Sequence, residues 1–116
     1  MFIGRFQPFH NGHKWLLEQR LKLGKKVCVA VMDIHNTEPE KNPYTTEEVL
    51  LNISEKMSEY LDKNLIKIIS IPPIESVNYG RDVGYSVIEH IPPEEIKKIS
   101  ATNIRRKKWY YYLITY

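Results

Sequence analysis

Apolar and polar positions alternate along the chain in blocks that predict strands and helices in turn. Lys26–Met32 is a continuous apolar run, typical of a strand buried on both faces of a parallel sheet, and Phe2–Phe6 and Leu65–Ile71 also have strand patterns. Between them, apolar residues recur at helical spacing over Gly12–Leu23 and again over Thr45–Leu61. Strands that alternate with helices predict an α/β fold with a parallel sheet and right-handed crossovers.

Local signals mark the ends of the two predicted helices. Gly24 stands where a C-cap of the first helix is expected, and the hydroxyl of Thr45, followed by two acids, predicts the start of the second. The residues expected to pack on the sheet are Trp15, Leu16, Leu17, Leu21 and Leu23 in the first helix, and Val49, Leu50, Ile53, Met57, Tyr60 and Leu61 in the second.

The pattern weakens after the third strand, which Pro72 and Pro73 stop. We expect a turn-rich loop over Ile74–Gly84 and a strand or short helix over Tyr85–Ile91. A last short strand is expected at Ile96–Ile99, with Thr102 capping a final basic helix.

Composition narrows the class of protein. The 116 residues fit a single domain, 1–116, that ends in an aromatic tail at 109–116. Cys28 is the one cysteine and lies in an apolar run, which predicts a buried free thiol in a reducing compartment. The sequence has no signal-peptide pattern and no apolar run near the ~20 residues of a membrane span. A cytoplasmic protein without a membrane partner is expected.

The net charge of +3 is mild, and only Arg105–Lys108 concentrates it. Because Trp109–Tyr112 follows, this segment could grip single-stranded nucleic acid by stacking. A helix end with cations near its C-terminal dipole, followed by an apolar tail, explains the same residues. We favour the second interpretation, since a short basic run without a wider basic surface gives a small electrostatic footprint.

Three polar loops follow the three predicted strands, and ligands bind beyond the carboxyl ends of strands in parallel sheets. The first loop carries His10 and His13 on either side of Gly12, at a strand-to-helix turn. Backbone N–H groups and the helix dipole favour an anion there, and imidazoles add donors that can carry charge near neutral pH. Glycine allows the backbone to approach a phosphate closely. A zinc site is disfavoured, because the other histidines are isolated in the sequence.

A second group of anion-binding residues lies near the other end of the chain. Ser100 and Thr102 are two apart, and Arg105 follows three residues later. Two hydroxyls, free N–H groups and a guanidinium can close around a phosphate at a helix N-terminus. An ordinary hydroxyl cap followed by a surface arginine would leave the same residues.

The two motifs together resemble those of a known superfamily. Gly4–His13 resembles the (H/T)xGH signature of the nucleotidyltransferase superfamily, and Ser100–Arg105 resembles its ISxTxIR signature. The long form of the first motif most resembles nicotinamide mononucleotide (NMN) adenylyltransferases of the archaeal type and related phage-borne enzymes, and Asn42–Thr45 is similar to a loop of theirs. The resemblance implies a compact Rossmann-like three-layer fold, with a short parallel sheet and helices on both faces.

The resemblance also implies a reaction, in which an acceptor's phosphate attacks the α-phosphorus of a nucleoside triphosphate and expels pyrophosphate. It implies that His10 and His13 contact the α- and β-phosphates and that His13 stabilises the transition state. Ser100, Thr102 and Arg105 would hold the β- and γ-phosphates, with Arg105 counted among the catalytic residues. Other residues expected at the nucleotide are Gly4, Arg5, Phe6 and Gly12.

The resemblance further implies ATP as donor, NMN or a similar phosphorylated small molecule as acceptor, and Mg²⁺ bound mainly through the triphosphate rather than by protein ligands. Candidate acceptor residues are Asp33, at the end of the second strand, and Tyr79 and Arg81 in the third loop. Strand termination and local ion pairing are the respective alternatives for these residues.

The region between the third strand and Ser100 is shorter than in most relatives, which leaves adenine or cytosine selectivity open. A CTP-dependent cytidylyltransferase acting on an alcohol phosphate and a non-catalytic nucleotide-binding module are the rival interpretations. A homodimer is also possible for a chain with a small core.

Overall fold

Three parallel strands, β1 (Phe2–Gly4), β2 (Val27–Met32) and β3 (Ile66–Ile71), form one sheet in the order β1-β2-β3 among the described residues of the computed structural model. The structure describes residues 1–34, 38–81, 84–99 and 104. In the register, Val29 lies opposite Phe2 on one side and Ile68 on the other. The predicted α/β class and its parallel sheet are confirmed, and the arrangement is consistent with a Rossmann-like fold.

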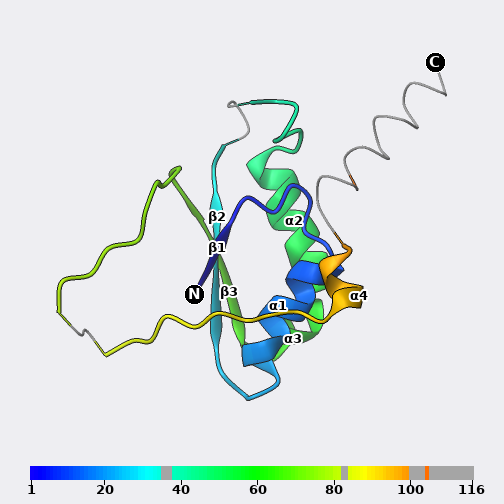
Figure 1. Ribbon diagram of the computed structural model, residues 1–116. Helices are drawn as coiled ribbons and strands as arrows, with labels where there is room; N and C mark the ends of the chain where they lie inside the picture. Colours follow the sequence, from blue (N-terminus) through cyan, green and yellow to red (C-terminus); the bar gives the residue numbers. More distant parts are fainter. Residues whose placement is uncertain (35–37, 82–83, 100–103, 105–116) are drawn as a thin grey trace.

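Over the described residues, four helices accompany the sheet: α1 (Asn11–Leu21), α2 (Thr46–Lys56), α3 (Ser58–Asp62) and α4 (Glu94–Lys97). Figure 1 shows them together on one side of the sheet. Both crossovers step in the same direction, from β1 to β2 and from β2 to β3, so right-handed connections place both on one face. Helices on the second face, which the three-layer expectation requires, are not found among the described residues.

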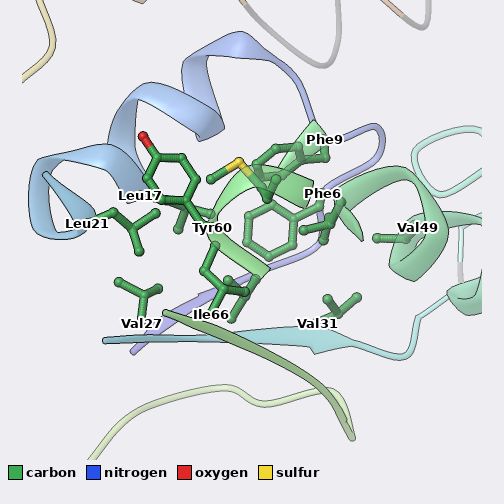
Figure 2. Packing of buried hydrophobic residues seen from close by; sticks show 12 residues of the cluster. Phe6, Phe9, Leu17, Leu21, Val27, Val31, Val49, Tyr60 and Ile66 are labelled. Carbon is green, nitrogen blue, oxygen red and sulfur yellow. The ribbon is translucent and has the colours of Figure 1, made fainter. Parts of the chain in front are cut away.

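The core lies between the sheet and these helices. Alternate residues of β2, namely Val27, Val29 and Val31, are buried and belong to the same apolar cluster as residues of α1, α2 and α3. Figure 2 shows Phe6 and Phe9 directed into this cluster from the turn that follows β1. The buried members are Phe6, Phe9, Leu17, Leu21, Val27, Val29, Val31, Val49, Ile53, Met57, Tyr60 and Ile66.

The other face of the sheet is less well covered. Ala30 is buried there, but Cys28 and Met32 are only partly buried and Ile3 is 37% exposed. Cys28 is therefore a free thiol that is partly exposed, rather than the buried one expected. The strand is therefore fully buried only on the face that meets the helices, and not on both faces as expected.

The first helix begins and ends close to the predicted positions. Its C-terminus is followed by Gly24 at φ +76°, a left-handed conformation that suits glycine. Leu17 and Leu21 are buried as predicted, but Leu23 is 64% exposed because it lies beyond the last turn of α1. The strand expected over Phe2–Phe6 stops at Gly4, since Phe6 itself adopts a left-handed φ of +52°.

The second predicted helix is present but broken at Met57, where α2 ends and α3 begins. Thr45 caps α2 in a reciprocal pair with Glu48, as the sequence predicts. A hydrogen bond of 2.6 Å from the Tyr60 hydroxyl to Glu18 joins α3 to α1. That bond, with burial and the Glu18 charge, raises the pKa of Tyr60 to about 12.

The last third differs most from expectation. Tyr85–Ile91 forms neither strand nor helix, and the strand expected at Ile96–Ile99 is wrong, because the helix α4 occupies Glu94–Lys97. Two acids in its first turn and a lysine in its last favour this short helix. Thr102 and the tail 109–116 lie outside the described residues. None of the described helices has the length and apolar character needed to cross a membrane.

Candidate functional site

The turn between β1 and α1 is shaped by the side chain of Phe6. Its aromatic ring folds back over Gly4, where an added Cβ would lie 3.0 Å from the ring. The same ring meets the His13 ring edge-on, with 5.0 Å between ring centroids, while Phe9 stacks on His13 at 5.5 Å. Gly4 and Phe6, which are expected at the nucleotide, therefore help to hold the His13 ring in place: Gly4 leaves room for the Phe6 ring, which contacts His13.

The two histidines cap α1 in place of the usual hydroxyl and carboxylate. Nδ1 of His10 accepts the backbone N–H groups of Gly12 and His13, at 3.0 and 3.3 Å. In return, the backbone N–H of His10 donates to Nδ1 of His13 at 3.2 Å. This reciprocal capping box stacks the two imidazoles, with 3.8 Å between ring centroids.

This capping fixes the tautomer of both rings. A neutral imidazole has one acceptor and one donor nitrogen, and both Nδ1 atoms are acceptors here. Each neutral ring therefore carries its proton on Nε2. Within the described part of the chain, neither Nε2 has a hydrogen-bond partner. The turn thus offers two N–H donors for an anion, close to the helix N-terminus.

The environment keeps these imidazoles neutral. Burial and then the charge of Lys56 lower the pKa of His10, and burial, His10 and Lys56 together lower the pKa of His13 to about 3. The expectation that these donors carry charge near neutral pH is therefore wrong for the free protein. They are neutral donors there, and the charge beside them belongs to Lys56.

Besides its predicted role of letting the backbone approach a phosphate, Gly12 leaves room for the His10 ring. An added Cβ would lie 2.9 Å from Cε1 and 3.0 Å from Nδ1 of His10. The His10 ring folds directly over this residue to reach the backbone N–H groups, so a side chain here would displace the ring.

The side chain of Gln7 joins the histidine turn to the loop that follows β2. Its amide donates to the Tyr44 carbonyl at 3.1 Å and accepts the Tyr44 N–H at 2.9 Å. Gln7 is 3% exposed, so this pair of hydrogen bonds is buried. The first two loops expected to converge at the carboxyl edge of the sheet do meet, through a contact that no sequence spacing indicated.

A second cross-link that sequence reasoning missed comes from α2. The ammonium of Lys56 donates to the backbone carbonyl of Phe9 at 3.2 Å. These residues are 47 positions apart, so the contact depends on the packing of α2 against the turn. Lysine is common on exposed helix faces, so the sequence alone does not predict this contact.

The other expected residues are less closely connected. Arg5 is exposed beside the turn. Asp33 accepts a hydrogen bond of 2.7 Å from the Thr46 hydroxyl, which ties the end of β2 to the start of α2. Tyr79 and Arg81 are exposed, in a segment that Figure 1 shows leaving the sheet on the side away from the helices. The structure does not bring these two residues to the histidine turn.

The second motif lies outside the described residues, but the helix before it does not. Ser100, Thr102 and Arg105 are not described. α4 packs beside α1, and the Ile96 carbonyl lies 3.8 Å from the position of a Cβ at Gly12. The helix that directly precedes the second motif in the sequence is therefore in contact with the helix that carries the first motif.

Among the described residues, no group of three or more His, Cys, Asp or Glu side chains is placed to hold a metal ion. The turn provides N–H donors, which suit phosphate oxygens rather than a cation.

Comparisons with known proteins show the family of the chain. A cytidylyltransferase-like family model matches residues 1–63. A nicotinamide-nucleotide adenylyltransferase of Picrophilus torridus is 30% identical over 94% of this chain and 61% of its own length. Proteins of the same name from Ignicoccus hospitalis and Sulfolobus acidocaldarius are 29% and 26% identical, over 76% and 75% of their lengths and 90% and 91% of this chain. The chain thus spans about three fifths of the Picrophilus relative.

Proposed function

The chain belongs to the cytidylyltransferase-like family, and on that premise we propose that it is a nucleotidyltransferase that moves AMP from ATP to nicotinamide mononucleotide or a similar phosphate. The histidine capping box supports this activity most strongly, because it holds two neutral imidazoles with their N–H donors on Nε2. The names of the relatives support ATP and nicotinamide mononucleotide as substrates.

In the proposed reaction, a phosphate oxygen of the acceptor attacks the α-phosphorus of ATP. A new P–O–P bond forms as the bond between the α-phosphorus and the bridging oxygen breaks, and pyrophosphate leaves with that oxygen. No enzyme nucleophile takes part, so catalysis consists of positioning and of stabilising charge on the phosphoryl oxygens. His10 and His13 donate their Nε2 protons as hydrogen bonds to the α- and β-phosphates, and His13 stabilises the transition state.

The neutral state of the rings suits this role. A donor that stays neutral before the substrate arrives costs little desolvation, and it strengthens as negative charge grows on the oxygens it contacts. The negative charge of a bound triphosphate would also raise the pKa of both rings. The donors are thus arranged before the reaction rather than formed during it.

The remaining residues complete the proposal. Gly4, Arg5, Phe6 and Gly12 form the nucleotide side of the turn. Ser100, Thr102 and Arg105 hold the β- and γ-phosphates, supported by the contact of α4 with α1. Asp33, Tyr79 and Arg81 are candidates for the acceptor side. If Mg²⁺ accompanies the triphosphate, phosphate oxygens and water would hold it, and it would neutralise part of the charge on the phosphates.

Pyrophosphate release tests this function across a small matrix of substrates. ATP and CTP are each combined with nicotinamide mononucleotide, with glycerol 3-phosphate, or with no acceptor. The proposal predicts release only when ATP and nicotinamide mononucleotide are both present. Release with CTP and glycerol 3-phosphate would instead identify a cytidylyltransferase, as the family description allows. Nucleotide binding without release from any pair would identify a binding module.

A further inference from the structure

Lys56 is linked to the histidine turn although it belongs to neither motif. It lies at the last position of α2, and its ammonium donates to the Phe9 carbonyl at 3.2 Å. Phe9 directly precedes His10, so this bond fixes the backbone one residue before the N-cap of α1. Phe9 itself is buried in the core, which makes its carbonyl a firm anchor.

No acid among the described residues pairs with Lys56 to neutralise its charge. In the described part of the chain, four other lysines form ion pairs with a glutamate three or four residues away, namely Lys22, Lys41, Lys63 and Lys97. Glu59 lies three residues after Lys56 but pairs with Lys63 instead, at 3.5 Å. Among the described residues, Lys56 has no ion-pair partner, so its positive charge remains available beside the turn.

This charge acts on both imidazoles. After burial, Lys56 is the main cause that lowers the pKa of His10, and it also lowers that of His13 after burial and the effect of His10. An uncompensated ammonium and two N–H donors thus occupy one short region at the start of α1. A cation so placed attracts a group with several negative charges more strongly than one with a single charge.

We propose that Lys56 is a positioning residue of the histidine turn, which clamps the Phe9 carbonyl from α2 and sets a fixed positive charge beside the two imidazoles for a polyphosphate. This proposal rests on the proposed function for its ligand. The clamp aligns the cap, and the charge compensates the anion that the neutral rings alone do not neutralise.

The test compares three variants of the full chain. Lys56→Met keeps the aliphatic stem without the ammonium, and Lys56→Arg restores a cation and donor. Lys63→Met removes an exposed lysine that pairs with Glu59 and, among the described residues, has no recorded bond to the turn. Urea unfolding first establishes that each variant is folded. Two measurements follow: the NMR titration of the His10 ring in the free protein, and calorimetric binding of inorganic tripolyphosphate at low salt.

Lys56→Met is expected to raise the pKa of His10 and to weaken tripolyphosphate binding about tenfold, the effect of losing one charged contact. Lys56→Arg should restore both within about twofold, and Lys63→Met should change neither. A lysine whose charge does not reach the turn would leave the pKa of His10 unchanged in Lys56→Met. If Lys56→Met matches the wild type in both measurements, the proposal is wrong. If the wild type binds no tripolyphosphate, the proposed function fails, and the His10 titration alone decides the role of Lys56.

Discussion

Nδ1 of His10 accepts the backbone N–H of His13, while Nδ1 of His13 accepts the backbone N–H of His10, at 3.3 and 3.2 Å. The pair that forms the candidate site is thus also the cap of the helix that carries it. Folding of α1 and orientation of the two donors are therefore one event.

Replacing His10 by asparagine should preserve the cap and remove the donor. The asparagine side-chain oxygen can accept the N–H groups that Nδ1 accepts now, so most of the stability should remain. His10→Ala loses the cap and should cost about 1 to 2 kcal/mol of unfolding free energy. Both variants should lose pyrophosphate release. Urea unfolding and the substrate assay measured on the same samples distinguish these effects. An active His10→Asn protein would contradict a role for Nε2.

Stability should fall in acid because of His13. In the unfolded chain its pKa is near 6.5, and in the folded chain it is about 3. Between these values the unfolded state binds more protons, so the free energy of unfolding decreases as pH falls from about 6.5 to about 3. Above pH 6.5 this contribution does not vary. His13→Asn should flatten the dependence, which urea unfolding at pH 7, 5 and 4 measures. An equally steep loss in the variant would assign the acid sensitivity to other groups.

Gly12→Ala should impair function more than stability. The new methyl group would meet the His10 ring at 2.9 Å, and the ring must turn away from the N–H groups that it accepts. We expect about a hundredfold loss of pyrophosphate release, with a stability change within about 1 kcal/mol, because alanine favours a helix while the cap weakens. Asn11→Ala, at the exposed neighbouring position, is the control and should remain active.

Gln7→Glu should destabilise the protein by about 2 to 4 kcal/mol, because a buried carboxylate would face the Tyr44 carbonyl in place of a donor. The matched substitution Gln19→Glu changes a residue of α1 whose amide donates to the Trp15 carbonyl within its own helix. It should cost less than about 1 kcal/mol. Similar losses in thermal or urea unfolding for both variants would show that the Gln7–Tyr44 bond does not hold the two loops together.

The sequence predicts the elements with strong periodicity and clear caps. The β2 strand, the Thr45 cap and the left-handed turn at Gly24 all depend on local residues, and all are present. It fails where local signals are weak. Ile96–Ile99 has the composition of a strand, yet the helix α4 forms here because Glu94 and Glu95 stand in its first turn. The position of helices relative to the sheet is a tertiary property that no local pattern contains.

The candidate site shows the same division. Two histidines flanking a glycine at a strand-to-helix turn identify the first motif from sequence alone. Their mutual capping, their neutral state and the contacts from Gln7 and Lys56 arise from packing between residues far apart in the sequence. Because their loop follows β3, Tyr79 and Arg81 are expected at the carboxyl edge of the sheet, but their segment departs from that edge (Figure 1).

Pyrophosphate release from ATP and nicotinamide mononucleotide by the wild type, His13→Ala and His90→Ala tests the central claim most directly. His90 stacks on Phe2, outside the turn, and provides the matched control for losing a histidine. We predict that the wild type and His90→Ala release pyrophosphate at similar rates. A folded His13→Ala protein should be slower by two to three orders of magnitude, since one transition-state donor contributes about 3 kcal/mol. Near-normal release by folded His13→Ala would contradict the account.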